Sequence, residues 1–228
     1  MLIGILVTGH ALDELIETRG NYDKIFGDLL NQYGFETKAW FVVDEDHPQS
    51  PADADAWIIT GSKHGAYEDH PWIPPLEEFI RAVYADGRPM VGICFGHQII
   101  AQALGGKVVK YDHGWAVGHT DYQIDGEDMR LLAWHQDQVI EKPAGATVIG
   151  SNAFCENAAL LYDNRILTIQ PHPEFDGEIV QKLIDLRGKG LVEPDRLSAA
   201  QALQHEAHDS ARFVERIARF FREGASHG

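Results

Sequence analysis

Cysteine is scarce in this chain, with only Cys94 and Cys155 among its 228 residues. Two cysteines make no disulfide framework and suit a reducing compartment, so we expect a cytoplasmic protein. Basic residues are also few, since 19 Lys and Arg stand against 35 Asp and Glu for a formal net charge of −16. This balance argues against binding to nucleic-acid phosphates and against docking on an anionic membrane.

Long apolar runs and nucleotide-binding motifs are missing as well. The opening run Leu2–Val7 is far shorter than the roughly 20 residues that cross a bilayer. No basic segment precedes it, so we interpret it as a buried strand rather than a signal peptide. The chain has no Gly-x-x-x-x-Gly-Lys-Ser/Thr motif, and the segment Gly4–Gly9 does not match Gly-x-Gly-x-x-Gly. We therefore expect no nucleotide cofactor.

The chain has twelve histidines, which are common metal ligands, but we find no metal-binding motif among them. The segment His205–His208 is one residue short of the zinc-protease motif His-Glu-x-x-His, and we expect it on a solvated helix face. His64 and His70 lie in a polar loop flanked by proline, with no cysteine nearby, and we expect them at the surface. The prediction is a protein without metal or other cofactor.

The pattern of apolar segments predicts a single α/β domain. Short Val- and Ile-rich runs alternate with helical patterns in the first half, which is typical of a mainly parallel sheet flanked by helices. The predicted strands there are Leu2–Val7, Thr37–Val43, Ala56–Thr60 and Met90–Ile93. The predicted helices are Tyr22–Tyr33, Leu76–Tyr84 and a third from Cys94 to the Gly105-Gly106 pair.

The second half changes texture after Lys107. Closely spaced strand-like segments predict an antiparallel extension, with Asp163-Asn164 as a tight turn. These segments are Thr120–Ile124, Arg130–Ala133, Thr147–Ser151, Ala159–Asp163 and Arg165–Ile169. Two apolar stripes near the C-terminus predict two helices packed on the core, separated at Glu193-Pro194-Asp195. The stripes are Ile179, Leu183, Ile184 and Leu186, then Phe213, Ile217, Phe220 and Phe221.

The most informative stretch is Met90–Gln98, where a buried strand ends in Gly-x-Cys-x-Gly and enters a helix. This is the nucleophile-elbow pattern with Cys94 in place of serine. Gly92 and Gly96 remove side chains where strand and helix pass closely, and the helix N-terminus favours a thiolate. The backbone N–H of Phe95 would face a developing oxyanion. Cys155 lacks this setting, and we expect it to be a small core residue.

A cysteine nucleophile needs a base, and the best candidate is His172 in the segment Gln170–Glu174. It follows a predicted strand that should end at the same sheet edge as Cys94. Pro171 and Pro173 favour extended backbone, in which His172 and Glu174 project to the same side. The carboxylate would then fix the imidazole tautomer. The rival base is His97, which has no evident carboxylate partner and which we expect to pack beside the elbow.

With Gly92–Gln98 and Pro171–Glu174 both present, the chain resembles the class I (triad-type) glutamine amidotransferases from about Leu2 to Phe175. The resemblance implies a flavodoxin-like three-layer sandwich with a nucleophile elbow, an antiparallel extension and a C-terminal helical tail. Residues 1–176 would form the amidotransferase-like domain, and residues 177–228 a helical extension packed on it. The implied catalytic triad is Cys94, His172 and Glu174.

The resemblance also implies residues that bind the substrate. Gly61 and Ser62, where the family has a Gly-Gly pair, would form the oxyanion hole together with Phe95. Gln98 would help to hold the substrate, and Gly114 and Trp115 would border it. The segment Trp134–Asp137 resembles a family segment near the mouth of the site and fits a turn at a strand end equally well.

Two enzymatic functions stay open. One is a glutaminase that releases ammonia from glutamine through a Cys94 thioester, for a synthase subunit on another chain. The other is a stand-alone hydrolase or peptidase acting on a γ-glutamyl conjugate, since the segment Ile58–Ser62 and the residues after it look closest to the stand-alone subgroup that includes plant γ-glutamyl peptidases. We expect no ATP-using synthetase domain within 228 residues. A non-catalytic binding module is a third, weaker alternative, because Cys94, His172 and Glu174 are all present.

Overall fold

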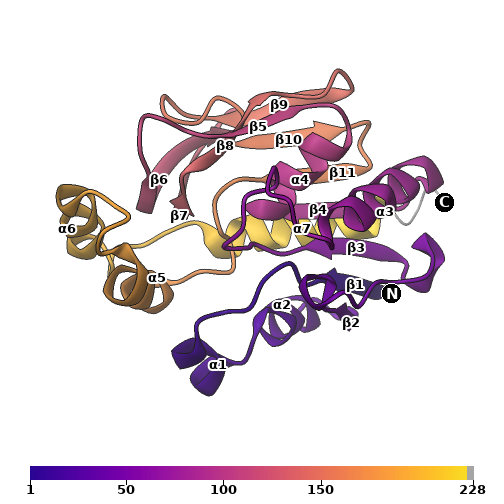
Figure 1. Ribbon diagram of the computed structural model, residues 1–228, viewed down its shortest axis with the longest axis horizontal. Helices are drawn as coiled ribbons and strands as arrows, with labels where there is room; N and C mark the ends of the chain where they lie inside the picture. Colours follow the sequence, from indigo (N-terminus) through magenta and orange to yellow (C-terminus); the bar gives the residue numbers. More distant parts are fainter. Residues whose placement is uncertain (225–228) are drawn as a thin grey trace.

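Five parallel strands form the half of the sheet that carries the candidate site. The computed structural model describes residues 1–224, and its main sheet has nine strands (Figure 1). The parallel strands are β1 (Leu2–Leu6), β2 (Glu36–Trp40), β3 (Ala56–Ile59), β4 (Met90–Ile93) and β11 (Ile166–Ile169). Their order β2-β1-β3-β4-β11 is the flavodoxin-like order of a doubly wound sheet. The predicted α/β fold is thereby confirmed.

The predicted antiparallel extension is also present. Next to β11 lie β10 (Ala159–Tyr162), β9 (Ala146–Ser151), β6 (Ala116–Ile124) and β7 (Glu127–His135), all paired antiparallel. Asp163 and Asn164 connect β10 and β11 as predicted, with φ of 46° and 55°, the left-handed conformation of a two-residue hairpin turn. A separate pair, β5 (Lys107–Lys110) with β8 (Asp137–Glu141), was not predicted.

Helices cover both faces of the parallel strands, as the apolar patterns require. On one face α2 (Tyr22–Asn31) and α7 (Ser210–Gly224) bury Phe26, Phe213 and Phe221 against the sheet. On the other face α3 (Ile73–Asp86) and α4 (Phe95–Ala103) bury their apolar side chains against the sheet and form a second hydrophobic cluster. Figure 1 shows α3 and α4 in front of the strands and α7 behind them. The layers form the expected three-layer sandwich, with α7 part of its core.

Three short helices gather beside the C-terminal ends of the parallel strands. They are α1 (Asp13–Arg19), α5 (Gly177–Leu183), extended by the π-helical turn η3 (Ile184–Gly188), and α6 (Pro194–Ala202). Leu15, Leu183 and Ala200 bring them into one apolar cluster. The expected break at Glu193-Pro194-Asp195 is therefore only partly right, because Pro194 begins a helix, as proline often does at a first helical position. The division into residues 1–176 and 177–228 stays a prediction.

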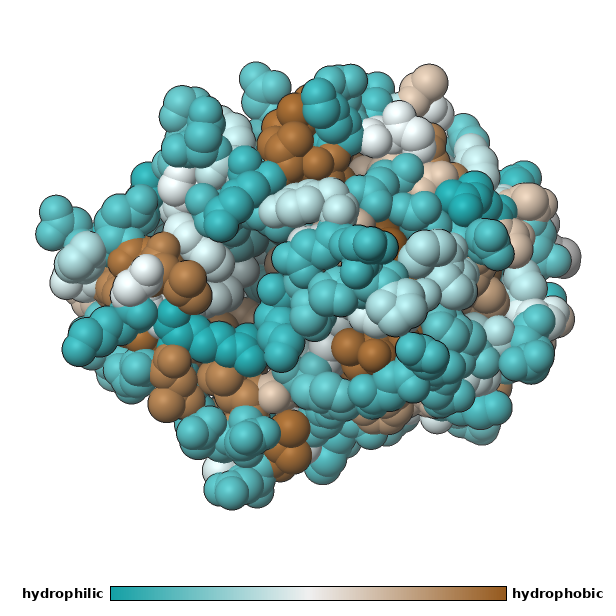
Figure 2. Space-filling view, viewed as in Figure 1, coloured by the Kyte–Doolittle hydropathy of each residue, from teal (hydrophilic) through white to brown (hydrophobic). Residues whose placement is uncertain are grey.

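Two 3₁₀ turns complete the elements, η1 (Val42–Asp44) and η2 (Pro51–Asp53). The first of them corrects the predicted strand Thr37–Val43, which ends at Trp40. None of the described helices is both long and apolar enough to cross a membrane. Figure 2 shows a face that is mostly hydrophilic, with small, separated hydrophobic groups.

Candidate active site

Cys94 lies at the junction of β4 and α4, where the chain turns sharply. Its φ of 51° and ψ of −101° place a non-glycine residue in a conformation that side chains rarely adopt. A Cβ at Gly96 would lie 2.4 Å from the Ile59 carbonyl oxygen, and one at Gly92 would lie 2.6 Å from the Gly96 carbonyl oxygen. The two glycines therefore let the strand and helix approach closely, and Cys94 lies at the positive end of the α4 dipole.

His172 and Glu174 form a buried pair directly after β11. The Nδ1 of His172 lies 2.6 Å from Oε1 of Glu174, and their side chains are 5% and 0% exposed. The His172 backbone N–H donates to the Leu132 carbonyl on β7, and the Phe175 ring stacks on the imidazole with ring centroids 3.9 Å apart. These contacts fix the ring orientation, and the two side chains project to the same side as the extended backbone predicts.

Gly61 shows how close Cys94 and His172 lie to each other. A Cβ built there would be 3.0 Å from Cε1 of His172 and 3.8 Å from Cβ of Cys94. Burial by itself lowers the pKa of His172, but the negative charges of Glu174 and the Cys94 sulfur outweigh it and raise that pKa to about 10. The pKa of His172 is thus raised because a carboxylate and a sulfur lie close to the same imidazole.

Gly61 and Ser62 follow β3 and are held in place by two buried threonines. The Gly61 carbonyl accepts hydrogen bonds from the hydroxyls of Thr8 and Thr60, both at 3.1 Å. The Ser62 hydroxyl donates to the Thr8 carbonyl at 2.7 Å. Ser62 is not among the described non-glycine residues with positive φ, so its backbone needs no glycine. Neither threonine was predicted as a site residue, although a Thr-Gly pair follows β3 directly and β1 after one residue.

A pocket of about 230 Å³ opens above Cys94. Gln98 lines it with its side-chain amide donating to the Asp137 carbonyl at 2.9 Å and to Oε1 of Gln170 at 3.1 Å. Gln170 in turn donates to Sγ of Cys94 at 3.6 Å. Gln170 is thus a site residue that the sequence analysis missed, and its place directly before Pro171-His172 was the available signal.

The remaining predicted substrate-binding residues do not all reach the pocket. Trp115 lines it and packs against Trp134, with ring centroids 6.0 Å apart. Gly114 is not among the lining residues, and a Cβ there would lie 2.8 Å from Oε1 of Glu193. The segment Trp134–Asp137 satisfies both interpretations, because it lines the pocket and also joins β7 to β8.

His97 is placed away from the pocket, as expected for a packing residue. It is fully buried, and its Nδ1 lies 2.7 Å from the Thr168 hydroxyl on β11. Burial lowers the pKa of His97 to about 3, and it does the same to His135, which lines the pocket. Cys155 is buried as expected, which raises the pKa of its thiol to about 12.

Two expectations about the other histidines need correction. His64 and His70 are half-buried rather than at the surface, with side chains 22% and 31% exposed, and His64 lines the pocket. The segment His205–His208 lies in the loop after α6, not on a helix, because α6 ends at Ala202.

The chain is similar to glutamine amidotransferases and to γ-glutamyl peptidases. The family model "Glutamine amidotransferase class-I" matches residues 28–184. A glutamine amidotransferase-like protein of Schizosaccharomyces pombe is 30% identical over 245 residues, covering 97% of this chain and 98% of its own. Gamma-glutamyl peptidase 4 of Arabidopsis thaliana is 28% identical over 222 residues, covering 90% and 88%. The solved structure of a glutamine amido transferase from Methylobacillus flagellatus matches with a TM-score of 0.77 at 20% identity, over 100% and 94%.

The buried His97 predicts an acid-sensitive fold. Its pKa of about 3 lies below the ordinary value of 6.5, so between these values the unfolded chain binds a proton that the native chain does not. The free energy of unfolding should therefore fall as the pH falls, by up to about 1.4 kcal/mol per pH unit for this residue. His97→Asn keeps a partner for Thr168 and removes the titration. We expect it to reduce the slope of the free energy of unfolding against pH by about that amount.

Urea unfolding at several values between about pH 4 and about pH 6 measures this slope. His113→Asn is the control, because the His113 side chain is 71% exposed and its replacement should leave the slope unchanged. An equal slope in His97→Asn and the unmodified chain would contradict the prediction.

Proposed function

Because the chain belongs to the class I glutamine amidotransferase family, we propose that it hydrolyses the γ-carboxamide of glutamine through a thioester on Cys94. The observation that carries the proposal is the buried His172–Glu174 pair beside Cys94, at 2.6 Å between Nδ1 and Oε1. A buried carboxylate next to an imidazole, with a sulfur on the other side of the imidazole, is the arrangement of a nucleophilic triad.

In the proposed reaction, Sγ of Cys94 attacks the γ-carbonyl carbon and forms the C–S bond. His172 gives its proton to the departing nitrogen, so ammonia leaves as the C–N bond breaks. Water then attacks the thioester while His172 accepts a proton from it. The C–S bond then breaks, glutamate is released, and the Cys94 thiolate and the protonated His172 are restored. Glu174 holds the ring and stabilises the imidazolium throughout. The steps need only side chains, backbone amides and water.

We propose that the backbone N–H groups of Ser62 and Phe95 form the oxyanion hole. Gly61 is the residue between Thr60 and Ser62. In a trans peptide the C=O of one residue and the N–H of the next point in opposite directions. The Gly61 carbonyl is bound by Thr8 and Thr60, so the Ser62 N–H is directed away from these threonines. Gly61 also borders Cys94 and His172 directly. Two threonine hydroxyls would thus orient a donor before the charge develops.

The charge distribution of the pocket supports a substrate with a carboxylate. Despite the net charge of −16, three cationic residues line the pocket against two carboxylates: Lys63, Lys110 and Arg187 against Glu68 and Asp137. A γ-glutamyl group keeps its α-carboxylate during the reaction, and cations at the pocket wall would hold it. We propose Gln98 and Trp115 as further substrate contacts, and Gly114 as a turn residue beside them.

A stand-alone γ-glutamyl peptidase is the alternative, and the Arabidopsis thaliana relative with that name favours it, since it matches over 90% of this chain. The two functions share the thioester and differ in the leaving amine. The glutaminase function includes a separate synthase subunit as acceptor of ammonia, and both functions would operate in the cytoplasm. A non-catalytic module is disfavoured by the paired His172 and Glu174 beside Cys94.

Removing members of the triad should abolish turnover. We expect Cys94→Ala and His172→Gln to lower kcat for glutamate release by about 10⁴-fold or more, and Glu174→Gln by about 10²- to 10⁴-fold. His97→Asn is the matched control, since it changes a buried histidine of α4 within one turn of Cys94. It should keep kcat within about threefold. Loss of activity in His97→Asn with retention in His172→Gln would identify His97 as the base instead.

The hydrogen bonds from Thr8 and Thr60 to the Gly61 carbonyl predict that loss of a threonine hydroxyl lowers kcat selectively. Thr8→Val preserves volume and removes the hydroxyl that donates to the Gly61 and Thr60 carbonyls. Losing one oxyanion donor lowers kcat by about 10²- to 10³-fold, so a misdirected donor should lower it by about 10- to 100-fold, with little change in KM. Thr168→Val is the control, because Thr168 is equally buried but contacts His97 instead. Equal kcat in both variants would contradict the assignment.

The leaving group is tested by comparing substrates on the purified chain. We expect glutamate and ammonia release from glutamine at a higher kcat/KM than glutamate release from γ-glutamyl dipeptides. Fast cleavage of the dipeptides with negligible glutamine hydrolysis would instead establish the peptidase. Stimulation of glutamine hydrolysis by a co-purifying protein would support a glutaminase that works with a separate synthase subunit.

A further inference from the structure

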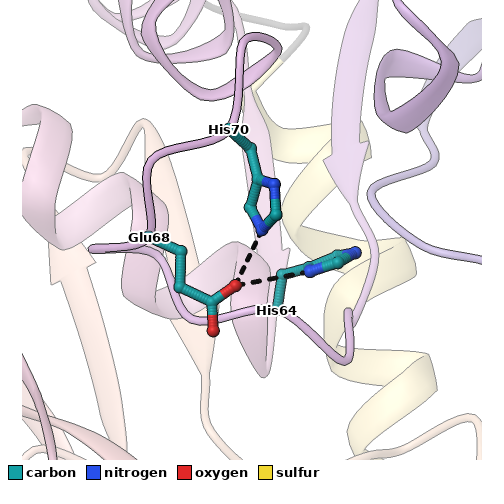
Figure 3. Close-up of side chains that lie close together, drawn as sticks. All are labelled: His64, Glu68 and His70. Atoms are coloured by element: carbon teal, nitrogen blue, oxygen red, sulfur yellow. Dashed lines mark hydrogen bonds and ion pairs between the residues drawn. The ribbon is translucent and has the colours of Figure 1, made fainter.

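The loop between β3 and α3 brings together three side chains that the proposed reaction does not use. His64, Glu68 and His70 converge on one point, as Figure 3 shows. Oε2 of Glu68 lies 2.7 Å from Nε2 of His70 and 3.4 Å from Nδ1 of His64. The three donor atoms all lie within 4.8 Å of one another, and no other such group of His, Cys, Asp or Glu occurs in residues 1–224.

The backbone and the neighbouring rings hold this loop in shape. The Glu68 N–H donates to the Gly65 carbonyl, the His70 N–H to the Glu68 carbonyl, and the Ile73 N–H to the His70 carbonyl. The His70 ring stacks on Trp72, with ring centroids 5.8 Å apart and planes 12° apart. The three donors are therefore positioned before any ligand arrives, which reduces the entropy lost on binding.

The chemistry of the donors points to a transition-metal ion. Two imidazole nitrogens and one carboxylate oxygen are the protein ligands of several open zinc sites. Ligands at about 2.1 Å from a tetrahedral ion lie roughly 3.4 Å from one another. The two separations from Glu68 are 2.7 Å and 3.4 Å, and the two imidazole nitrogens lie within 4.8 Å of each other, so small side-chain rotations would seat an ion. We propose that His64, Glu68 and His70 bind one divalent ion of the Zn²⁺ type.

The position of the site gives this ion access to the candidate active site. His64 and Glu68 line the same pocket as Cys94, whereas His70 is not among the lining residues. His64 is also tied to the proposed oxyanion loop, because its backbone N–H donates to the Ser62 hydroxyl at 3.2 Å. Three protein ligands leave a coordination position free, and an ion here would present it beside the pocket. The metal site does not depend on the proposed reaction, since the two use different side chains.

The test is metal binding by the Cys94→Ala chain, in which the candidate nucleophile cannot compete for the ion. Co²⁺ is titrated and followed by its visible d–d absorption, and Zn²⁺ is then added to displace it. We expect one Co²⁺ per chain, displaced by Zn²⁺. Adding His70→Gln or Glu68→Gln to Cys94→Ala should weaken Co²⁺ binding by about 100-fold.

The matched control is His119→Gln in the same Cys94→Ala chain. His119 also faces a second histidine, His208, with ring centroids 5.8 Å apart, but the pair belongs to no three-donor group in the described residues. The Co²⁺ affinity of the chain with both Cys94→Ala and His119→Gln should equal that of the chain with Cys94→Ala alone. Glu68→Gln leaves both imidazoles in place, so it tests the ligand even if His70→Gln disturbs the loop. Absence of Co²⁺ absorption, or equal affinity in Glu68→Gln and His119→Gln, would overturn the proposal.

Discussion

At Cys94 the chain leaves β4 and enters α4 with a φ of 51°, and the candidate site depends on this strained turn. The turn requires β4, α4 and β3 to pass within backbone contact, which only the glycines at positions 92 and 96 permit. Burial of α4 between the sheet and the β5–β8 pair stabilises the conformation. Strain of this kind persists only where the surrounding packing determines the backbone, and α4 is buried over nearly its whole length.

The parallel topology then determines which residues meet Cys94. Strands β1, β3, β4 and β11 all end at one edge of the sheet, so the residues that follow them are neighbours whatever their distance in sequence. Thr8 follows β1, Thr60 and Gly61 follow β3, and His172 follows β11. In the proposed reaction these residues would supply, in turn, hydroxyls that bind a carbonyl, a backbone amide donor and a proton carrier. The pocket at this edge has three cationic residues against two carboxylates in its lining, so it is locally less acidic than the protein as a whole.

This topology explains how much the sequence could predict. Strands such as Met90–Ile93 and helices such as α4 were predictable, because their apolar periods are strong and glycines or prolines bound them. The short elements α1, α6, β5 and β8 were missed, because their sequences are largely polar and carry too little apolar signal for their length. His172 and Glu174 were found from local backbone chemistry. Thr8 was not, because its contacts join the end of β1 to the segment after β3, and Gln170 was overlooked although it directly precedes Pro171-His172. His64, Glu68 and His70 lie on one loop, and their convergence depends on the backbone conformation of that loop, which no periodic pattern predicts.

The segment after β3 connects the proposed reaction with the proposed metal site. Thr60, Gly61 and Ser62 would shape the oxyanion hole, and the donors His64, Glu68 and His70 follow at once on the same loop. Ser62 links them physically, since its hydroxyl donates to the Thr8 carbonyl and accepts from the His64 N–H. A ligand that shifts the His64 backbone would therefore act on Ser62 or break this hydrogen bond, whereas a rotation of the His64 side chain alone would leave it intact. In the two proposals taken together, a backbone shift on ion binding would be transmitted to the oxyanion hole without a second domain or a distant site.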